Sequence, residues 1–146
     1  MVLAKGQGAG PAPEARVPAG FELIQAVPPG MVAHPTLGCV DAKGRLFVGD
    51  SPGTAWGTAR HEAEKAGRIV MLEDRDGDGV FDRSTVFADG LTVPKGACWL
   101  DGSLYVASPP GIWKFTDTDG DGVADQRKLL VGGFQWTANG ADVHGP

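Results

Sequence analysis

The chain has 146 residues, a net charge of −5 and 42% hydrophobic residues, which is typical of one soluble globular domain. No apolar run approaches the roughly 20 residues needed to span a bilayer, and the mildly acidic charge argues against a nucleic-acid-binding surface. The 23 glycines and 11 prolines indicate many turns and little helix. We therefore expect an all-β chain.

The chain opens with residues 1–16, which lack the basic start and apolar core of a signal peptide. Their composition predicts a disordered N-terminal arm. Residues 21–27 follow and are interpreted as a stray β-strand.

Four β-rich runs come next, at residues 37–40, 46–48, 68–72 and 84–87, and they predict one four-stranded unit. A second unit repeats it at residues 97–100, 104–107, 112–115 and 128–131. The early strands of the two units match at a spacing of 58 residues and the late strands at a spacing of 43. One insertion, residues 54–68 of the first unit, explains the difference. This insertion is predicted to be a polar loop with a short helix.

Each unit carries the nine-residue pattern D-x-D-G-D-G-x-x-D between its third and fourth strands, starting at Asp74 and at Asp117. This is the ligand order of a calcium loop, in which side chains at positions 1, 3, 5 and 9 and the carbonyl at position 7 bind one ion. The predicted ligands are Asp74, Asp76, Asp78, Val80 and Asp82 in the first loop, and Asp117, Asp119, Asp121, Val123 and Asp125 in the second. The alternative is a pair of Asp-Gly-rich hairpin turns that bind no metal.

An EF-hand would place a glutamate at position 12, where this chain has Thr85 and Lys128. The flanking runs are also strands rather than helices. We therefore expect calcium loops between two strands, with coordination completed by water, because oxygen-only ligands favour calcium over zinc or copper.

A repeat of four antiparallel strands every 43 residues is typical of a β-propeller blade. We predict an incomplete β-propeller over residues 17–146, with blade one at residues 35–90, blade two at 91–133 and the start of blade three at 134–146. About two and a half blades cannot close a ring of four to eight. We expect the chain to be the front part of a longer propeller whose missing blades are its partner, with residues 21–27 pairing with the last blade. An assembly of several copies is the alternative.

Two cysteines, Cys39 and Cys98, have no metal-ligand spacing. They are either buried free thiols, which we favour, or one disulfide. Three tryptophans on the predicted blades, Trp99, Trp113 and Trp136, are expected to pack between stacked blades.

The motif order resembles the N-terminal propeller of the membrane-bound dehydrogenases that are abundant in planctomycetes. The resemblance covers residues 17–146 and is carried by residues 17–23 (VPAGFEL), 44–48 (GRLFV), 67–79 (GRIVMLEDRDGDG), 86–91 (VFADGL) and 117–125 (DTDGDGVAD). That family is similar to the quinoprotein glucose and sorbosone dehydrogenases. The resemblance implies an extracytoplasmic protein that oxidises a sugar or alcohol with pyrroloquinoline quinone (PQQ), bound in the full-length protein on the insertion face.

Oxidation of this kind needs a general base. Where the quinoprotein relatives carry a histidine at the start of a blade, this chain has Trp136 or Thr137. The remaining candidates lie in the insertion: Arg60 and His61 for catalysis and Trp56 for cofactor binding, unless these are ordinary surface residues. Two functions are therefore weighed: the front part of a quinone-dependent dehydrogenase, inactive by itself, or a non-catalytic, calcium-stabilised propeller that binds carbohydrate or protein.

Overall fold

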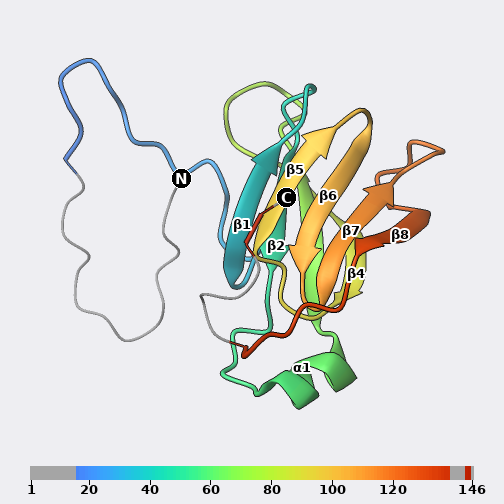
Figure 1. Ribbon diagram of the computed structural model, residues 1–146. Helices are drawn as coiled ribbons and strands as arrows, with labels where there is room; N and C mark the ends of the chain where they lie inside the picture. The colour runs from blue at the N-terminus through green and yellow to red at the C-terminus, as the bar shows by residue number, and fades with distance from the viewer. Residues whose placement is uncertain (1–15, 139–143, 146) are drawn as a thin grey trace.

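The computed structural model describes residues 16–138 together with residues 144 and 145, and it contains two four-stranded antiparallel sheets and one short helix (Figure 1). Sheet one consists of β1 (Pro35–Val40), β2 (Leu46–Asp50), β3 (Gly67–Glu73) and β4 (Arg83–Leu91). Sheet two consists of β5 (Gly96–Leu100), β6 (Ser103–Ser108), β7 (Gly111–Thr116) and β8 (Gln126–Val131). The helix, α1 (Thr58–Glu64), interrupts the connection between β2 and β3.

In each sheet every strand is hydrogen-bonded to the next one along the chain, so the orders are β1-β2-β3-β4 and β5-β6-β7-β8. Short turns make this meander possible. Gly44 and Gly102, in the β1–β2 and β5–β6 turns, have φ angles of +80° and +74°, which favour glycine. In the first of these turns the buried Asp41 carboxylate accepts the N–H groups of Lys43 and Arg45 at 2.8 and 3.0 Å.

The main core lies between the two sheets. Phe47, Met71 and Phe87 of sheet one pack against Leu104 and Phe115 of sheet two, and all five are at most 2% exposed. Two of these rings, Phe47 and Phe87, meet edge to face with their centroids 4.9 Å apart. Alternate residues of a strand point to opposite faces, so one row of apolar positions on each sheet builds this core.

A second, smaller core covers the other face of sheet one. Val48, Val70 and Leu72 are buried there beneath Val27 and Val32 of the segment before β1. We call residues 21–33 the N-terminal segment. Sheet one is therefore covered on both faces, by sheet two and by the N-terminal segment.

The connections separate into two ends, as expected for antiparallel neighbours. The β3–β4 and β7–β8 connections, which carry the two Asp-Gly patterns, lie at one end of the sheets, and α1 lies at the other end, at the bottom of Figure 1. Within the described residues, no helix is both long enough and apolar enough to cross a membrane.

The all-β prediction is confirmed, and each of the eight strands predicted within the two units overlaps an observed strand. The predicted strand at residues 21–27 is wrong for this structure, which has no regular element there. A strand needs a hydrogen-bonded partner strand, and none of the described strands pairs with these residues. The predicted disordered arm lies outside the described residues apart from Arg16, as do residues 139–143 and 146 of the predicted start of blade three.

Both cysteines are free, as favoured, although Cys39 is only half-buried and Cys98 is exposed. Two of the three tryptophans lie at the inter-sheet core. Trp99 stacks on Phe47 with a centroid separation of 5.0 Å, and Trp113 packs against the same cluster. Trp136 instead contacts the helix end of the molecule.

Candidate functional site

The β3–β4 connection, residues 74–82, is here called loop one, and its backbone wraps around its own carboxylates. The two oxygens of Asp74 accept the N–H groups of Gly77 and Gly79 at 2.7 and 2.9 Å. Asp76 accepts the N–H of Asp78 at 3.3 Å, and Asp78 accepts that of Val80 at 2.8 Å. The glycines allow this curl because both have positive φ angles, +76° and +88°.

The β7–β8 connection, residues 117–125 or loop two, repeats these contacts one for one. Asp117 accepts the N–H groups of Gly120 and Gly122 at 2.7 and 3.0 Å. Asp119 accepts from Asp121 at 3.3 Å, and Asp121 accepts from Val123 at 2.7 Å. Two loops that share a ligand order therefore also share a hydrogen-bond pattern.

Carboxylate oxygens converge in both loops, although the two sets differ. Oxygens of Asp74, Asp76 and Asp78 lie within 4.8 Å of one another in loop one, and oxygens of Asp117, Asp119 and Asp125 do so in loop two. These six are brought together as predicted. The remaining predicted side chains, Asp82 and Asp121, lie outside these groups, and the carbonyls of Val80 and Val123 stay predicted ligands only.

The ninth residue of each loop has a different partner. In loop one the Arg75 guanidinium lies 3.0 Å from the Asp82 carboxylate, so that carboxylate is engaged by a cation of the chain itself. In loop two the residue equivalent to Arg75 is Thr118, whose hydroxyl and N–H donate to Asp125 at 2.5 and 2.9 Å. Asp125 has no ion-pair partner in the part of the chain that the structure describes.

Hydrogen bonds lower the pKa of one carboxylate in each loop. The N–H of Gly79, followed by that of Gly77, holds the pKa of Asp74 below its usual range. The Thr118 hydroxyl and N–H lower the pKa of Asp125 in the same way. One carboxylate in each loop is therefore stabilised in its ionised form, within a few ångströms of other aspartates of the same loop.

The opposite end of the molecule gathers the three candidates from the insertion. His61, on α1, lies between Trp56 and Trp136, with ring centroids 5.4 and 6.0 Å away. The Arg60 guanidinium stacks 4.4 Å from the centre of the Trp56 ring. The Trp136 indole N–H donates to a carboxylate oxygen of Glu62 at 3.0 Å, which fastens the segment after β8 to α1.

His61 is only 5% exposed, and its Nδ1 has no hydrogen-bond partner among the described residues. Burial lowers the pKa of this imidazole, and the Lys95 ammonium lowers it further. His61 is therefore neutral at pH 7. It is the centre of a small aromatic cluster rather than an exposed group.

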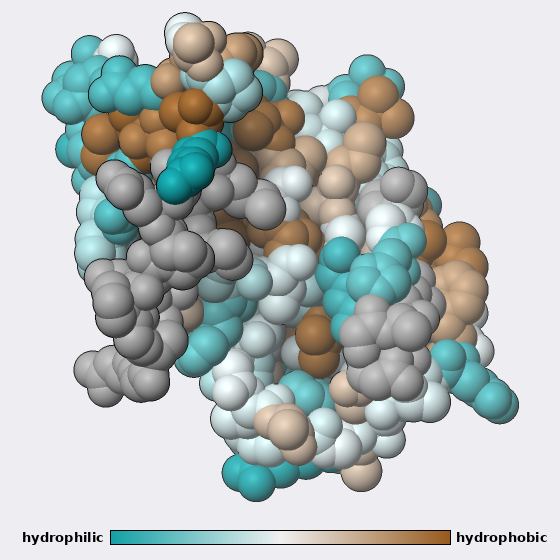
Figure 2. Space-filling model, turned by 90° about the vertical axis from the view of Figure 1, so that its left-hand side faces the viewer, coloured by the Kyte–Doolittle hydropathy of each residue, from teal (hydrophilic) through white to brown (hydrophobic). Residues whose placement is uncertain are grey.

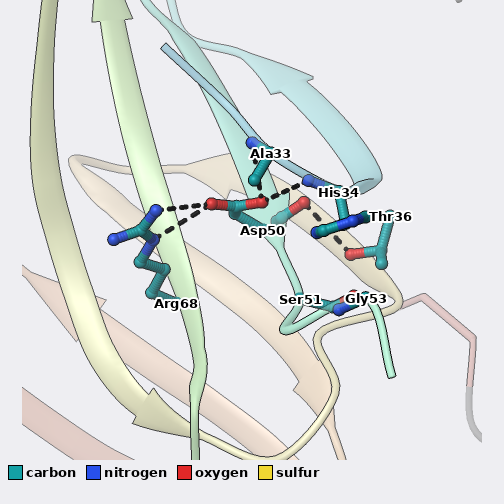
Figure 3. A network of polar contacts seen from close by, with 8 residues as sticks. Ala33, His34, Thr36, Asp50, Ser51, Gly53 and Arg68 are labelled. Carbon is teal, nitrogen blue, oxygen red and sulfur yellow. Dashed lines mark hydrogen bonds and ion pairs between the residues drawn. The ribbon is translucent and has the colours of Figure 1, made fainter. Parts of the chain in front are cut away.

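A third polar feature, missed by the sequence reasoning, joins the N-terminal segment to sheet one (Figure 3). The Asp50 carboxylate is 2% exposed; one oxygen accepts the N–H groups of Ala33 and His34 at 3.1 and 2.7 Å. The other accepts Nε and Nη2 of Arg68 at 3.0 and 2.7 Å. The only signal in the sequence was an aspartate ending an apolar strand where the second unit has Ser108. These four hydrogen bonds link the N-terminal segment and β3 to the end of β2, so Asp50 helps to hold the chain together.

Comparison with known proteins adds a family and no activity. A family model described as a domain of unknown function (DUF7133) matches residues 12–145. No curated protein and no solved structure matches the chain. Because the matched residues span nearly the whole sequence, the chain belongs to the DUF7133 family.

Proposed function

We propose that this chain is a calcium-binding β-repeat module of propeller type, in which one ion in each Asp-Gly loop braces the hairpin between the third and fourth strands of its sheet. The observation that carries the proposal is the convergence of three carboxylates within 4.8 Å in each of two loops that share one backbone pattern. Such crowded charges repel one another unless a cation lies between them. The ligand set contains only oxygen, which favours calcium.

The ligands in loop one are Asp74, Asp76 and Asp78, and those in loop two are Asp117, Asp119 and Asp125, with water completing both shells because position 12 supplies no glutamate. We expect dissociation constants of about 10⁻⁴–10⁻³ M, the range of extracellular calcium modules. Sites this weak suit a protein outside the cytosol, which is where we place the chain. At 10 mM calcium each filled site then adds about 1.4–2.7 kcal/mol to the free energy of unfolding.

Isothermal titration calorimetry and thermal unfolding, each with calcium and with magnesium, test this proposal. Calcium should release or absorb heat and raise the melting temperature, whereas magnesium should do so less because it demands octahedral geometry. Asp74→Asn combined with Asp117→Asn should abolish the calcium response. Asp101→Asn, in the exposed β5–β6 turn, is the matched control and should preserve the response. A parent chain that shows neither heat nor a melting shift would rule out the metal sites.

The second candidate function is the front part of a PQQ-dependent sugar or alcohol dehydrogenase. It rests on the resemblance given above and on the gathering of Trp56, Arg60 and His61 next to Trp136. The residues do not fit catalysis as they are arranged, because a general base must come within hydrogen-bond distance of the substrate and His61 is 5% exposed. We therefore rank the non-catalytic module, binding carbohydrate or protein, above the enzyme.

Dye reduction with a panel of sugars and alcohols, with added PQQ and calcium, separates the two functions. The chain of 146 residues should be inactive under both. If a longer natural protein shows turnover, Arg60→Ala and His61→Ala in that protein decide whether the cluster is involved. Unchanged turnover in both variants would remove these residues as candidates.

A further inference from the structure

The described residues that follow β8 reach α1 at the lower end of the molecule (Figure 1). We call residues 132–138 the C-terminal strap. Near its start, the N–H of Phe134 donates to the carbonyl of Pro110, in the β6–β7 turn, at 3.0 Å. Further on, the Trp136 indole N–H donates to the Glu62 carboxylate of α1 at 3.0 Å. The strap is therefore anchored on sheet two and fastened to α1 by a side chain.

The side chain that this fastening covers is His61. Its ring lies between Trp56, in the β2–α1 connection, and Trp136 of the strap, with ring centroids 5.4 and 6.0 Å away. His61 is 5% exposed although α1 has only seven residues. So short a helix cannot enclose a side chain by itself. The burial of His61 therefore depends on the two tryptophans, one of which belongs to the strap.

The enclosure suits a neutral imidazole better than a charged one. The Nδ1 atom of His61 is buried and has no hydrogen-bond partner among the described residues. A neutral imidazole can carry its proton on Nε2 and leave Nδ1 as an unused acceptor. An imidazolium has a proton on both nitrogens, so Nδ1 would become a buried cationic donor with no acceptor. Burying such a group is costly, and the closed arrangement therefore favours the neutral ring.

Charged groups on the neighbouring segments strengthen this preference. The strap has no charged residue, and neither do residues 51–57 before α1. The β4–β5 connection contributes Lys95, whose ammonium repels a positive charge on His61. Burial of the ring, followed by this ammonium, lowers the pKa of His61.

The charged groups of α1 itself are engaged elsewhere. The Arg60 guanidinium stacks 4.4 Å from the centre of the Trp56 ring and lies 3.9 Å from the Glu64 carboxylate. The Glu62 carboxylate accepts the Trp136 indole N–H. Neither carboxylate forms an ion pair with His61 within the described residues. No counter-ion is therefore in place for an imidazolium beneath the strap.

The helix end faces solvent. Figure 2 shows mainly teal and white surface at the bottom of the molecule, where α1 lies, whereas brown hydrophobic surface gathers at the upper left. The Arg60 and Glu64 side chains are 61% and 53% exposed. Displacing the strap would therefore bring His61 next to water, which can accept both N–H groups of an imidazolium.

We propose that the C-terminal strap is a pH-sensitive lid, closed on α1 while His61 is neutral and opened when His61 takes up a proton. In the open state Trp136 leaves Glu62, and His61 is uncovered next to Trp56 and Arg60. A proton stabilises the open state because it binds more tightly to a hydrated imidazole than to an enclosed one, so it shifts the population towards opening. Access to the three candidate residues of the insertion thus depends on pH. The inference goes beyond the proposed function and does not depend on calcium.

Nuclear magnetic resonance of the ¹⁵N-labelled chain tests the lid. Spectra are recorded from about pH 7.5 to about pH 5, which spans the usual pKa of histidine and stays above those of aspartate and glutamate. The chain has four tryptophans, and Trp136→Phe assigns the Trp136 indole signal. We expect the nuclear Overhauser contacts between Trp136 and His61 to be lost as the pH falls. The indole signal should shift with the same midpoint as the ring protons of His61, below about pH 6.5.

Variants identify the group that titrates. His61→Phe keeps an aromatic ring that cannot take up a proton, so the strap should stay closed across the whole range. His61→Gln is the second variant, which decides the question if the phenylalanine does not fit. Glu62→Gln keeps an oxygen acceptor for the indole N–H and does not titrate, so its lid should still open. His34→Gln and His144→Gln, at the two other histidines, are the matched controls and should also preserve the opening.

Three results would overturn the proposal. The first is a parent chain whose contacts between Trp136 and His61 persist at about pH 5. The second is opening that persists in the His61 variants. The third is a simultaneous change in the amide signals of both sheets, because that would be unfolding of the whole chain instead of movement of the strap. The titration is run in calcium and in EDTA, and the lid should behave alike in both, so a failure of the calcium sites gives a different result.

Discussion

Phe87→Ala measures whether the two sheets form one cooperative unit. The Phe87 side chain is 0% exposed and meets Phe47 edge to face, and both belong to the inter-sheet core. Truncating a fully buried phenylalanine costs about 3–5 kcal/mol, of which an aromatic pair supplies about 0.5–1.5 kcal/mol. Since small domains are stable by only about 5–15 kcal/mol in total, this single change should remove a large share of the stability.

Urea unfolding followed by tryptophan fluorescence is a suitable assay, because Trp99 stacks on Phe47 at the same interface. With a urea slope of about 2 kcal/mol per molar, a loss of about 4 kcal/mol lowers the midpoint by about 2 M. Phe21→Ala is the matched control: this ring is 72% exposed, so its removal should change the stability by less than about 0.5 kcal/mol.

Two results would refute this reasoning. A loss below about 1 kcal/mol for Phe87→Ala would mean that the sheets do not depend on this contact. Separate transitions in far-ultraviolet circular dichroism and in fluorescence would mean that the sheets unfold independently.

The other predictions concern charged groups. Asp50→Asn should lower the free energy of unfolding, measured by urea unfolding, by about 2 kcal/mol, because the charge-assisted hydrogen bonds from Arg68 are lost at a buried site. A change below about 0.5 kcal/mol would contradict the structural role of Asp50. The pKa of His61 is lowered in the folded chain, so the unfolded chain takes up a proton more readily than the folded one. The contribution of His61 to the free energy of unfolding should therefore be fully present above about pH 6.5 and decrease as the pH falls below that value. His61→Gln should flatten this pH dependence, and an unchanged pH profile in that variant would contradict the prediction. Arg75→Thr should tighten calcium binding at loop one by freeing Asp82, and calorimetry that finds equal affinity would show that the ion pair does not compete.

Local chemistry made the strands and loops predictable. Runs such as Leu104 to Ala107 alternate between the two faces of a strand, and Gly44 and Gly102 mark the tight turns between strands. The loop pattern around Asp74 was equally local, because each carboxylate is bound by N–H groups two to five residues further along. The repeat strengthened these predictions, since the same residues occur twice at fixed spacing.

The sequence by itself therefore determined the all-β class, the eight paired strands and the convergence of carboxylates in each Asp-Gly loop. Only the tertiary structure decided that residues 21–27 form no strand although Val27 packs on sheet one. It also decided that His61 is enclosed beside Trp136 and that Asp50 is buried with Arg68. The physical reason is how far apart along the chain the interacting residues lie. Turn and strand preferences depend on neighbours within a few residues, whereas burial and long-range hydrogen bonds depend on which distant residues lie across the space between the elements.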